Sequence, residues 1–235
     1  MKRRREGDEL ATSEIGSAIE ELSLMVMVVN NNNNIKSTAA AGPDHHLSTA
    51  QVPIKPFLSL CNFLIQILDK IGPTMAVMRQ DIHQNIQRLE KFHESNPSIY
   101  WDVVEILKKE VDENNAKKGP TCSKAFVWLT RSLDFTLAFL QLLVKDFDRN
   151  IEQTVQESYT LTLKPWHGWI SSAAYKVALR LVPDSKTLVN ILKPKDQDCN
   201  IFKEEIQNFI SLLVPLLHHY NDILRTYGLD KLKST

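Results

Sequence analysis

The stretch that decides the fold lies at residues 75–89 and reads MAVMRQDIHQNIQRL. Its apolar residues recur every three or four positions, and this is the spacing of one face of an α-helix. They are Met75, Met78, Ile82, Ile86 and Leu89. The stretch therefore predicts a helix with one buried face.

Three polar residues lie along the edge of this apolar stripe. At about 100° per residue, Asp81, Asn85 and Arg88 fall within roughly 60° of one another. A carboxylate, an amide and a guanidinium on one ridge can hold a neutral, hydroxyl-rich head group through several hydrogen bonds. An ordinary solvated helix face is the alternative interpretation of this segment alone.

The chain from Pro53 onward continues this helical pattern, with breaks at Gly and Pro. We expect helices at about 55–71, 74–93, 98–115 and 121–145, a fifth to 163 and a sixth to 181, then 184–192 and 198–227. No segment combines strand alternation with turn residues. The prediction is an all-α domain, a helical fold of about eight helices over residues 53–235.

Residues 1–52 predict a poorly ordered leader. They contain five consecutive asparagines at 30–34 and no sustained periodicity. At most, a transient helix is expected over 14–29. The only dense apolar run there, 22–29, is too short to span a bilayer, and acidic residues follow the basic start, which is unlike a secretory signal.

The balance of charge and the cysteines limit the function classes. The 28 basic residues equal the 28 acidic ones, so no overall field favours nucleic acid. Cys61, Cys122 and Cys199 are odd in number and far apart, which favours free thiols in a reducing compartment over a disulfide framework. A cytoplasmic protein is the expectation.

Two further segments carry unusual side chains. In the helix expected from residue 121, Trp128 lies opposite the apolar stripe, with Lys124 one turn before it. Trp128 is either packed under a loop or free to stack on a flat, polar-edged ring such as a sugar.

The other segment is Lys164-Pro165-Trp166-His167-Gly168-Trp169. Pro165 disfavours helix at Lys164 and favours a new helix start, so His167 is expected in the first turn of the next helix. Trp166 and Trp169 beside it suit a membrane interface. A structural histidine remains the alternative for His167.

Enzymatic and metal-dependent functions have little support in the sequence. Asp81, His167 and a serine could be imagined as a hydrolytic triad, but no Gly-x-Ser-x-Gly elbow is present. His45-His46 and His218-His219 lack a spaced third ligand. We expect neither an enzyme nor a metal or cofactor.

In their order along an all-helical chain, the three segments resemble the glycolipid transfer protein superfamily, from about Pro53 to Gly228. The matching motifs are Asp-x-x-x-Asn-Ile-x-x-Leu at 81–89, Trp-Leu-x-Arg-x-Leu at 128–133, and His167 with Trp169. Within the superfamily, the chain most resembles plant members of the glycolipid transfer or accelerated-cell-death-like type. The resemblance implies a two-layer helical sandwich that encloses a lipid pocket.

The resemblance also implies a head-group site for a sphingolipid. Asp81, Asn85 and Arg88 would bind the first sugar, and Asp81 would also accept from the ceramide amide. His167 would donate to the amide carbonyl, and Trp128 would stack on the sugar. Trp169 and Trp166 would make transient peripheral contact with a membrane.

Asn85 and Trp128 favour the glycolipid branch, because the phosphate-recognising branch has cations at those two positions. The implied function is non-enzymatic transfer of a glycosylceramide between membranes. Two departures leave ceramide 1-phosphate open: Gln84 replaces a common glycine, and Lys124 coincides with an arginine of the phosphate branch. A sphingolipid-sensing adaptor in cell-death regulation is the other alternative.

Overall fold

The computed structural model describes residues 14–38, 51–195 and 197–234, and every regular element within them is helical. The helices are α1 (Glu14–Thr38), α2 (Ile54–Ile71), the short 3-10 helix η1 (Pro73–Met75), α3 (Ala76–Ser95), α4 (Val103–Asp112), α5 (Cys122–Leu143), α6 (Ile151–Leu161), α7 (Trp169–Leu179), α8 (Ser185–Leu192) and α9 (Cys199–Thr226). The all-α prediction is confirmed.

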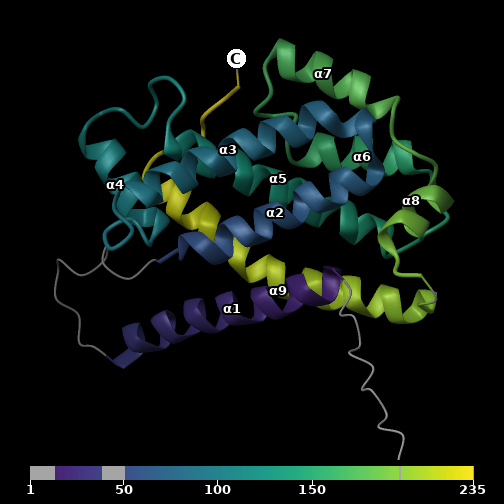
Figure 1. The fold of residues 1–235 in the computed structure, drawn as a ribbon, viewed down its shortest axis with the longest axis horizontal. Helices are drawn as coiled ribbons and strands as arrows, with labels where there is room; N and C mark the ends of the chain where they lie inside the picture. The colour runs from purple at the N-terminus through teal and green to yellow at the C-terminus, as the bar shows by residue number, and fades with distance from the viewer. Residues whose placement is uncertain (1–13, 39–50, 196, 235) are drawn as a thin grey trace, which may run out of the picture.

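α5 occupies the middle of the helical sandwich and packs against α3, α4, α6 and α9 (Figure 1). By length and composition alone α5 could cross a membrane. Half of the residues in the most apolar 18-residue stretch of α5 are buried inside the protein, however. Side chains such as those of Phe126 and Leu133 have no exposed surface. α5 is therefore the core helix of this fold.

Several helices begin where the sequence supplies a capping side chain. Thr121, Asp184 and Asp198 accept hydrogen bonds from the first turns of α5, α8 and α9. α4 begins later than expected, because Asp102 rather than Ser98 caps it. The buried Asp102 carboxylate accepts from Val104 N at 2.9 Å and from Val52 N at 2.8 Å, which ties α4 to the start of α2.

The prediction of a disordered leader is wrong for residues 14–38. These residues form α1, which lies along α9 and also contacts α2 (Figure 1). Ala18, Leu22, Met25 and Val29 are buried at helical spacing, and they belong to the main hydrophobic core. The full helix could not be predicted from the sequence, because the run of asparagines interrupts the apolar spacing by which helices are recognised. Residues 1–13 and 39–50 lie outside the described part of the chain.

Candidate lipid-binding site

The polar ridge of α3 forms as the helical spacing predicts. Asn85 is buried, Asp81 is exposed and Arg88 is partly buried. The Asn85 amide donates to the Asp81 carbonyl oxygen at 3.0 Å and accepts from Arg88 Nη1 at 2.9 Å. Asn85 therefore fixes the direction of the Arg88 guanidinium, which stays beside the Asp81 carboxylate.

The surroundings of Asp81 act on its ionisation in two directions. Partial desolvation raises the pKa of the Asp81 carboxyl above its usual value, and the neighbouring Arg88 charge lowers it. The net direction is upward. Although the residue is exposed, its carboxylate is partly desolvated on the side of the helix. Partial desolvation strengthens an accepted hydrogen bond relative to bulk water, which suits Asp81 to the N–H or O–H donors of a lipid head group.

His167 faces the ring of Trp128, and their centroids lie 5.6 Å apart. We expected His167 in the first turn of the next helix, but it lies in the link before α7. The backbone keeps turning after α6, with His167 N bonded to Leu163 O at 3.1 Å, and α7 begins only at Trp169, after Gly168. The prediction of a helix start at Pro165 is wrong for this reason.

The surroundings of His167 favour its neutral ring and leave one ring nitrogen without a hydrogen-bond partner among the described residues. Desolvation and then the Arg131 charge lower the pKa of His167 below its ordinary value. Its Nδ1 atom is buried and has no hydrogen-bond partner among the described residues. A ligand carbonyl or hydroxyl would satisfy this atom.

Arg131 organises the aromatic side of the site, a role that the sequence analysis missed. Its guanidinium carbon lies 4.8 Å from the Trp128 centroid and 4.3 Å from that of Trp166, within cation–π range. Its Nη2 and Nη1 donate to the carbonyls of Asp230 and Leu232 at 2.9 and 2.6 Å. Burial lowers the pKa of Arg131 to about 10, so it stays charged.

The segment after α9 closes the same region. Ser234 N donates to Trp166 O at 2.9 Å, while Gly168 N donates to Ser234 Oγ at 2.8 Å. Ser171 on the first turn of α7 also donates to Ser234 Oγ, at 2.9 Å. Sequence alone gave no signal for these contacts, because most of them use backbone atoms.

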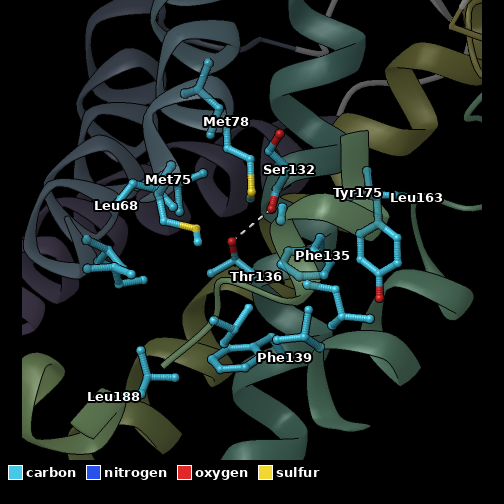
Figure 2. Close-up of a pocket in the computed structure, with 18 of the residues that line it drawn as sticks. Leu68, Met75, Met78, Ser132, Phe135, Thr136, Phe139, Leu163, Tyr175 and Leu188 are labelled. Atoms are coloured by element: carbon cyan, nitrogen blue, oxygen red, sulfur yellow. Dashed lines mark hydrogen bonds between the residues drawn. The ribbon is translucent and has the colours of Figure 1, made fainter. Parts of the chain in front are cut away.

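An apolar cavity of about 180 Å³ is lined by residues from the helices that carry these polar groups and from their neighbours, and Figure 2 shows part of this lining. Its wall includes Ile82, next to Asp81, and Ser132, one turn after Trp128. The remaining lining comes from α2, α3, α5, α6, α7, α8 and their links: Leu64, Ile67, Leu68, Ile71, Met75, Met78, Phe135, Thr136, Phe139, Leu140, Val155, Leu163, Tyr175, Ala178, Leu179, Val182, Pro183, Leu188 and Leu192. Such a polar rim over an apolar interior suits an amphipathic ligand.

The three remaining predicted site residues have different surroundings. Lys124 is partly buried on α5, one turn before Trp128. Trp169 is 80% exposed at the start of α7. Trp166 differs from the expectation of a membrane contact, because its partly buried ring packs on Arg131. Within the described ranges no three His, Cys, Asp or Glu side chains are placed to hold a metal ion.

Known proteins resemble this chain in sequence and in fold. The chain is 51% identical to glycolipid transfer protein 3 of Arabidopsis thaliana, and the match covers the whole of both chains. The structure of FAPP2, described as selecting simple glycosphingolipids with this fold, superposes with a TM-score of 0.72 at 23% identity, over 80% of this chain and 92% of that one.

A variant of Arabidopsis accelerated-cell-death 11 bound to ceramide-1-phosphate superposes with a TM-score of 0.74 at 16% identity, over 93% of this chain and 98% of the other. These two similarities concern the fold alone. The sequence model of the glycolipid transfer protein family matches residues 52–194, which is more than half of the chain. The protein is therefore a member of the glycolipid transfer protein family.

Proposed function

We propose that the protein transfers a sphingolipid between membranes, and that the preferred lipid is a glycosylceramide. The observation that carries this proposal is that hydrogen-bonding residues adjoin the wall of the apolar cavity: Asp81 directly precedes the wall residue Ile82, and His167 N donates to the carbonyl of the wall residue Leu163. Such a site can hold the two parts of a sphingolipid at once. Family membership supports it, because relatives at full length are named as glycolipid transfer proteins.

The thermodynamics of lipid exchange explain how such a site acts without chemistry. Two lipid chains together contain about 30 methylenes, and moving them into water would be unfavourable by on the order of 20 kcal/mol. An apolar cavity that receives the chains removes most of this penalty. Transfer then needs no bond cleavage and no energy source, only brief contact with each membrane.

The charges at the rim support a neutral head group. Asn85 is uncharged, and Trp128 offers a ring face on which a sugar can stack. Arg131 lies against the Trp128 ring, and its Nη1 and Nη2 atoms already donate to backbone carbonyls. A desolvated phosphate needs close charge-assisted partners, and the Nη1 and Nη2 atoms of Arg131 are not free to act as such partners.

Ceramide 1-phosphate is the second candidate, because two cations, Arg88 and Lys124, flank the rim. Competition between glucosylceramide and ceramide 1-phosphate tests the choice in a vesicle transfer assay. We expect the sugar lipid to be preferred, by the wild type and by Lys124→Ala alike. Preference for the phosphate lipid that is lost in Lys124→Ala, but kept in the exposed-site control Lys117→Ala, would assign the protein to phosphate lipids.

Membrane contact is assigned to the start of α7. Trp169 and Ile170 are 80% and 52% exposed, and the exposed cations Lys164 and Lys176 are nearby in the sequence. Exposed aromatic and aliphatic side chains beside lysines suit a shallow membrane interface. Trp169→Ala should slow transfer between vesicles severalfold and leave binding of dispersed lipid unchanged. Trp101→Ala, which removes an exposed tryptophan elsewhere, is the matched control.

A sensing adaptor would use the same pocket without transfer. The measurement that separates the two functions is the rate at which fluorescent glycosylceramide moves between donor and acceptor vesicles. A rate at background, together with lipid-dependent capture of a soluble protein partner, would replace transfer by sensing.

A further inference from the structure

The hydroxyl of Tyr175 lies buried without a hydrogen-bond partner among the residues that the structure describes. Tyr175 belongs to α7 and lines the apolar cavity (Figure 2). A buried hydroxyl that lacks a hydrogen-bond partner is unfavourable. Its presence in the cavity wall indicates that the ligand of the cavity supplies a partner.

The other hydroxyls of the cavity wall are satisfied by the protein. Ser132 Oγ donates to Trp128 O at 2.9 Å, and Thr136 Oγ1 donates to Ser132 O at 2.9 Å, the bond drawn in Figure 2. The remaining lining side chains are apolar. A water molecule beside Tyr175 would need two to four polar partners. The cavity wall itself provides few of them, and the polar groups that act on Tyr175 from outside the wall are Tyr159 and Glu152.

The position of Tyr175 relates it to the head-group end of the cavity. Its ring stacks on Tyr159, with centroids 3.4 Å apart and planes 5° from parallel. Tyr159 in turn contacts His167 at 5.5 Å between centroids. Tyr175 therefore lies two ring contacts away from the predicted amide-binding histidine, where the first carbons of a lipid chain would pass.

The ring is held in this place and stays protonated. Tyr159 Oη donates to Ser172 Oγ on α7 at 3.4 Å, which adds to the stacking between the two tyrosines. Desolvation raises the pKa of Tyr175 to about 12. The hydroxyl is therefore both a donor and an acceptor at neutral pH.

We propose that Tyr175 binds a hydroxyl group on the lipid chain, so that the protein prefers sphingolipids hydroxylated close to the amide. This inference rests on the sphingolipid binding proposed above, and it names a finer substrate class. The hydroxyl can belong to the acyl chain, at the carbon next to the amide carbonyl, or to the long-chain base. A site with a buried polar group discriminates against an analogue that leaves this group unpaired.

Competitive binding measured by native mass spectrometry tests this preference with two matched pairs of glucosylceramides. One pair differs only in the acyl hydroxyl, and the other only in an additional hydroxyl on the long-chain base. We expect the wild type to favour the hydroxylated member of one pair by about threefold to tenfold, the worth of one buried hydrogen bond. The pair that shows the preference identifies the hydroxyl.

Two variants of the chain locate the effect. Tyr175→Phe should lose the preference while its affinity for the non-hydroxylated lipids is kept or increased. Tyr220→Phe removes a hydroxyl that is buried outside the cavity, where it contacts Met25 Sδ at 3.7 Å, and it should keep the preference. The same comparison in vesicle transfer should give the same order of lipids.

The possible results separate this inference from the proposed function. Equal affinities in both pairs, with transfer intact, would show that water satisfies Tyr175 and would overturn only this inference. A preference that survives in Tyr175→Phe would overturn it as well. Failure of the wild type to bind any of the four lipids would overturn both proposals.

Discussion

At the scale of single residues, a substitution at Asp81 can test ligand binding without disturbing the fold. Its side chain is exposed, and the hydrogen bond that it gives the helix comes from its backbone carbonyl. Asp81→Val should therefore leave the melting temperature and the helical circular dichroism unchanged. We expect lipid affinity to fall about tenfold or more, because the ligand loses an acceptor worth about 1–3 kcal/mol.

Titration of the variant with glucosylceramide measures this loss. Glu94→Ala, which removes an exposed carboxylate from the same helix, should bind as the wild type does. If the Asp81→Val variant unfolds, the carboxylate supports the fold instead.

Asp134 is a second carboxyl whose environment has a measurable consequence. It lies between α5 and α9, and it accepts from Asn221 Nδ2 at 3.3 Å, with Arg131 and His218 nearby. Desolvation raises its pKa from 3.8 to about 6 despite these partners. The folded protein therefore holds this proton more tightly than the unfolded chain does.

The pH dependence of stability follows from this difference. At low pH the carboxyl is protonated in both states and contributes nothing. As pH rises through the interval from 3.8 to about 6, the unfolded chain releases its proton first and the free energy of unfolding falls. Asp134→Asn keeps an acceptor for Asn221 without this charge.

Asp134→Asn should raise the free energy of unfolding by about 1–2 kcal/mol near neutral pH, and should change little in strong acid. Urea unfolding across the pH range measures the difference, with the exposed-site variant Asp222→Asn as control. A stabilisation that is the same at every pH would assign it to packing rather than to titration.

At the scale of elements, α1 offers a matched test of its packing. Leu22 has no exposed surface, while Leu24, two residues further along the same helix, is 64% exposed. Leu22→Ala should lower the free energy of unfolding by about 2–4 kcal/mol through lost burial and a residual cavity. Leu24→Ala should change it by less than about 0.5 kcal/mol.

Chemical denaturation of both variants decides whether α1 is part of the fold. Equal and small effects would mean that α1 detaches from α9 in solution. Removal of residues 1–38 should then be harmless, whereas packing as described predicts a large loss of stability, since the deletion would expose Tyr220.

The helices show how much the sequence could predict. Elements that begin at a strong cap and keep one apolar face, such as α5 after Thr121, could be located closely. α1 could not, because nothing local says that its apolar face meets α9, a helix far away in sequence. The start of α7 was misplaced because the hydrogen bond of His167 N to Leu163 O extends the preceding turns past Pro165.

The site likewise has features that follow from local residue spacing and features that depend on long-range packing. The α3 ridge needs only helical periodicity, so the proximity of Asp81, Asn85 and Arg88 could be predicted from residue spacing. The meeting of Trp128 with His167 was implied only by the family resemblance. The contacts of Arg131 with the segment after α9, and the lack of a partner for the Tyr175 hydroxyl, depend on how helices far apart in the sequence pack together. No local sequence pattern predicts such packing.

At the scale of the whole molecule, the cavity is too small for its proposed ligand. It has a volume of about 180 Å³, whereas pockets for drug-sized ligands alone measure roughly 300–1,000 Å³. The chains of a sphingolipid can enter only if helices move apart. We expect α7 to be the element that moves, because none of its residues is buried as a whole and only single atoms such as the Tyr175 hydroxyl oxygen are enclosed.

Hydrogen exchange with and without bound glycosylceramide tests this motion. We expect the amides of α7 to exchange rapidly in the free protein and severalfold more slowly in the complex, where lipid chains fill the space beneath them. The core of α9 around Leu217 should change little. Unaltered exchange in α7, with lipid bound as shown by native mass spectrometry, would place the moving element elsewhere.

The hydrogen bonds from Arg131 to the carbonyls of Asp230 and Leu232 can form only late in synthesis. Arg131 lies 101 positions before Leu232, the residue whose carbonyl receives its Nη1 atom. Chains emerge from the ribosome with the amino-terminal part first, so the helices that carry Asp81 and Trp128 are exposed long before the segment at 230–234 appears. The Arg131 guanidinium of a nascent chain therefore has to wait for about 100 further residues before its two carbonyl partners, those of Asp230 and Leu232, are synthesised.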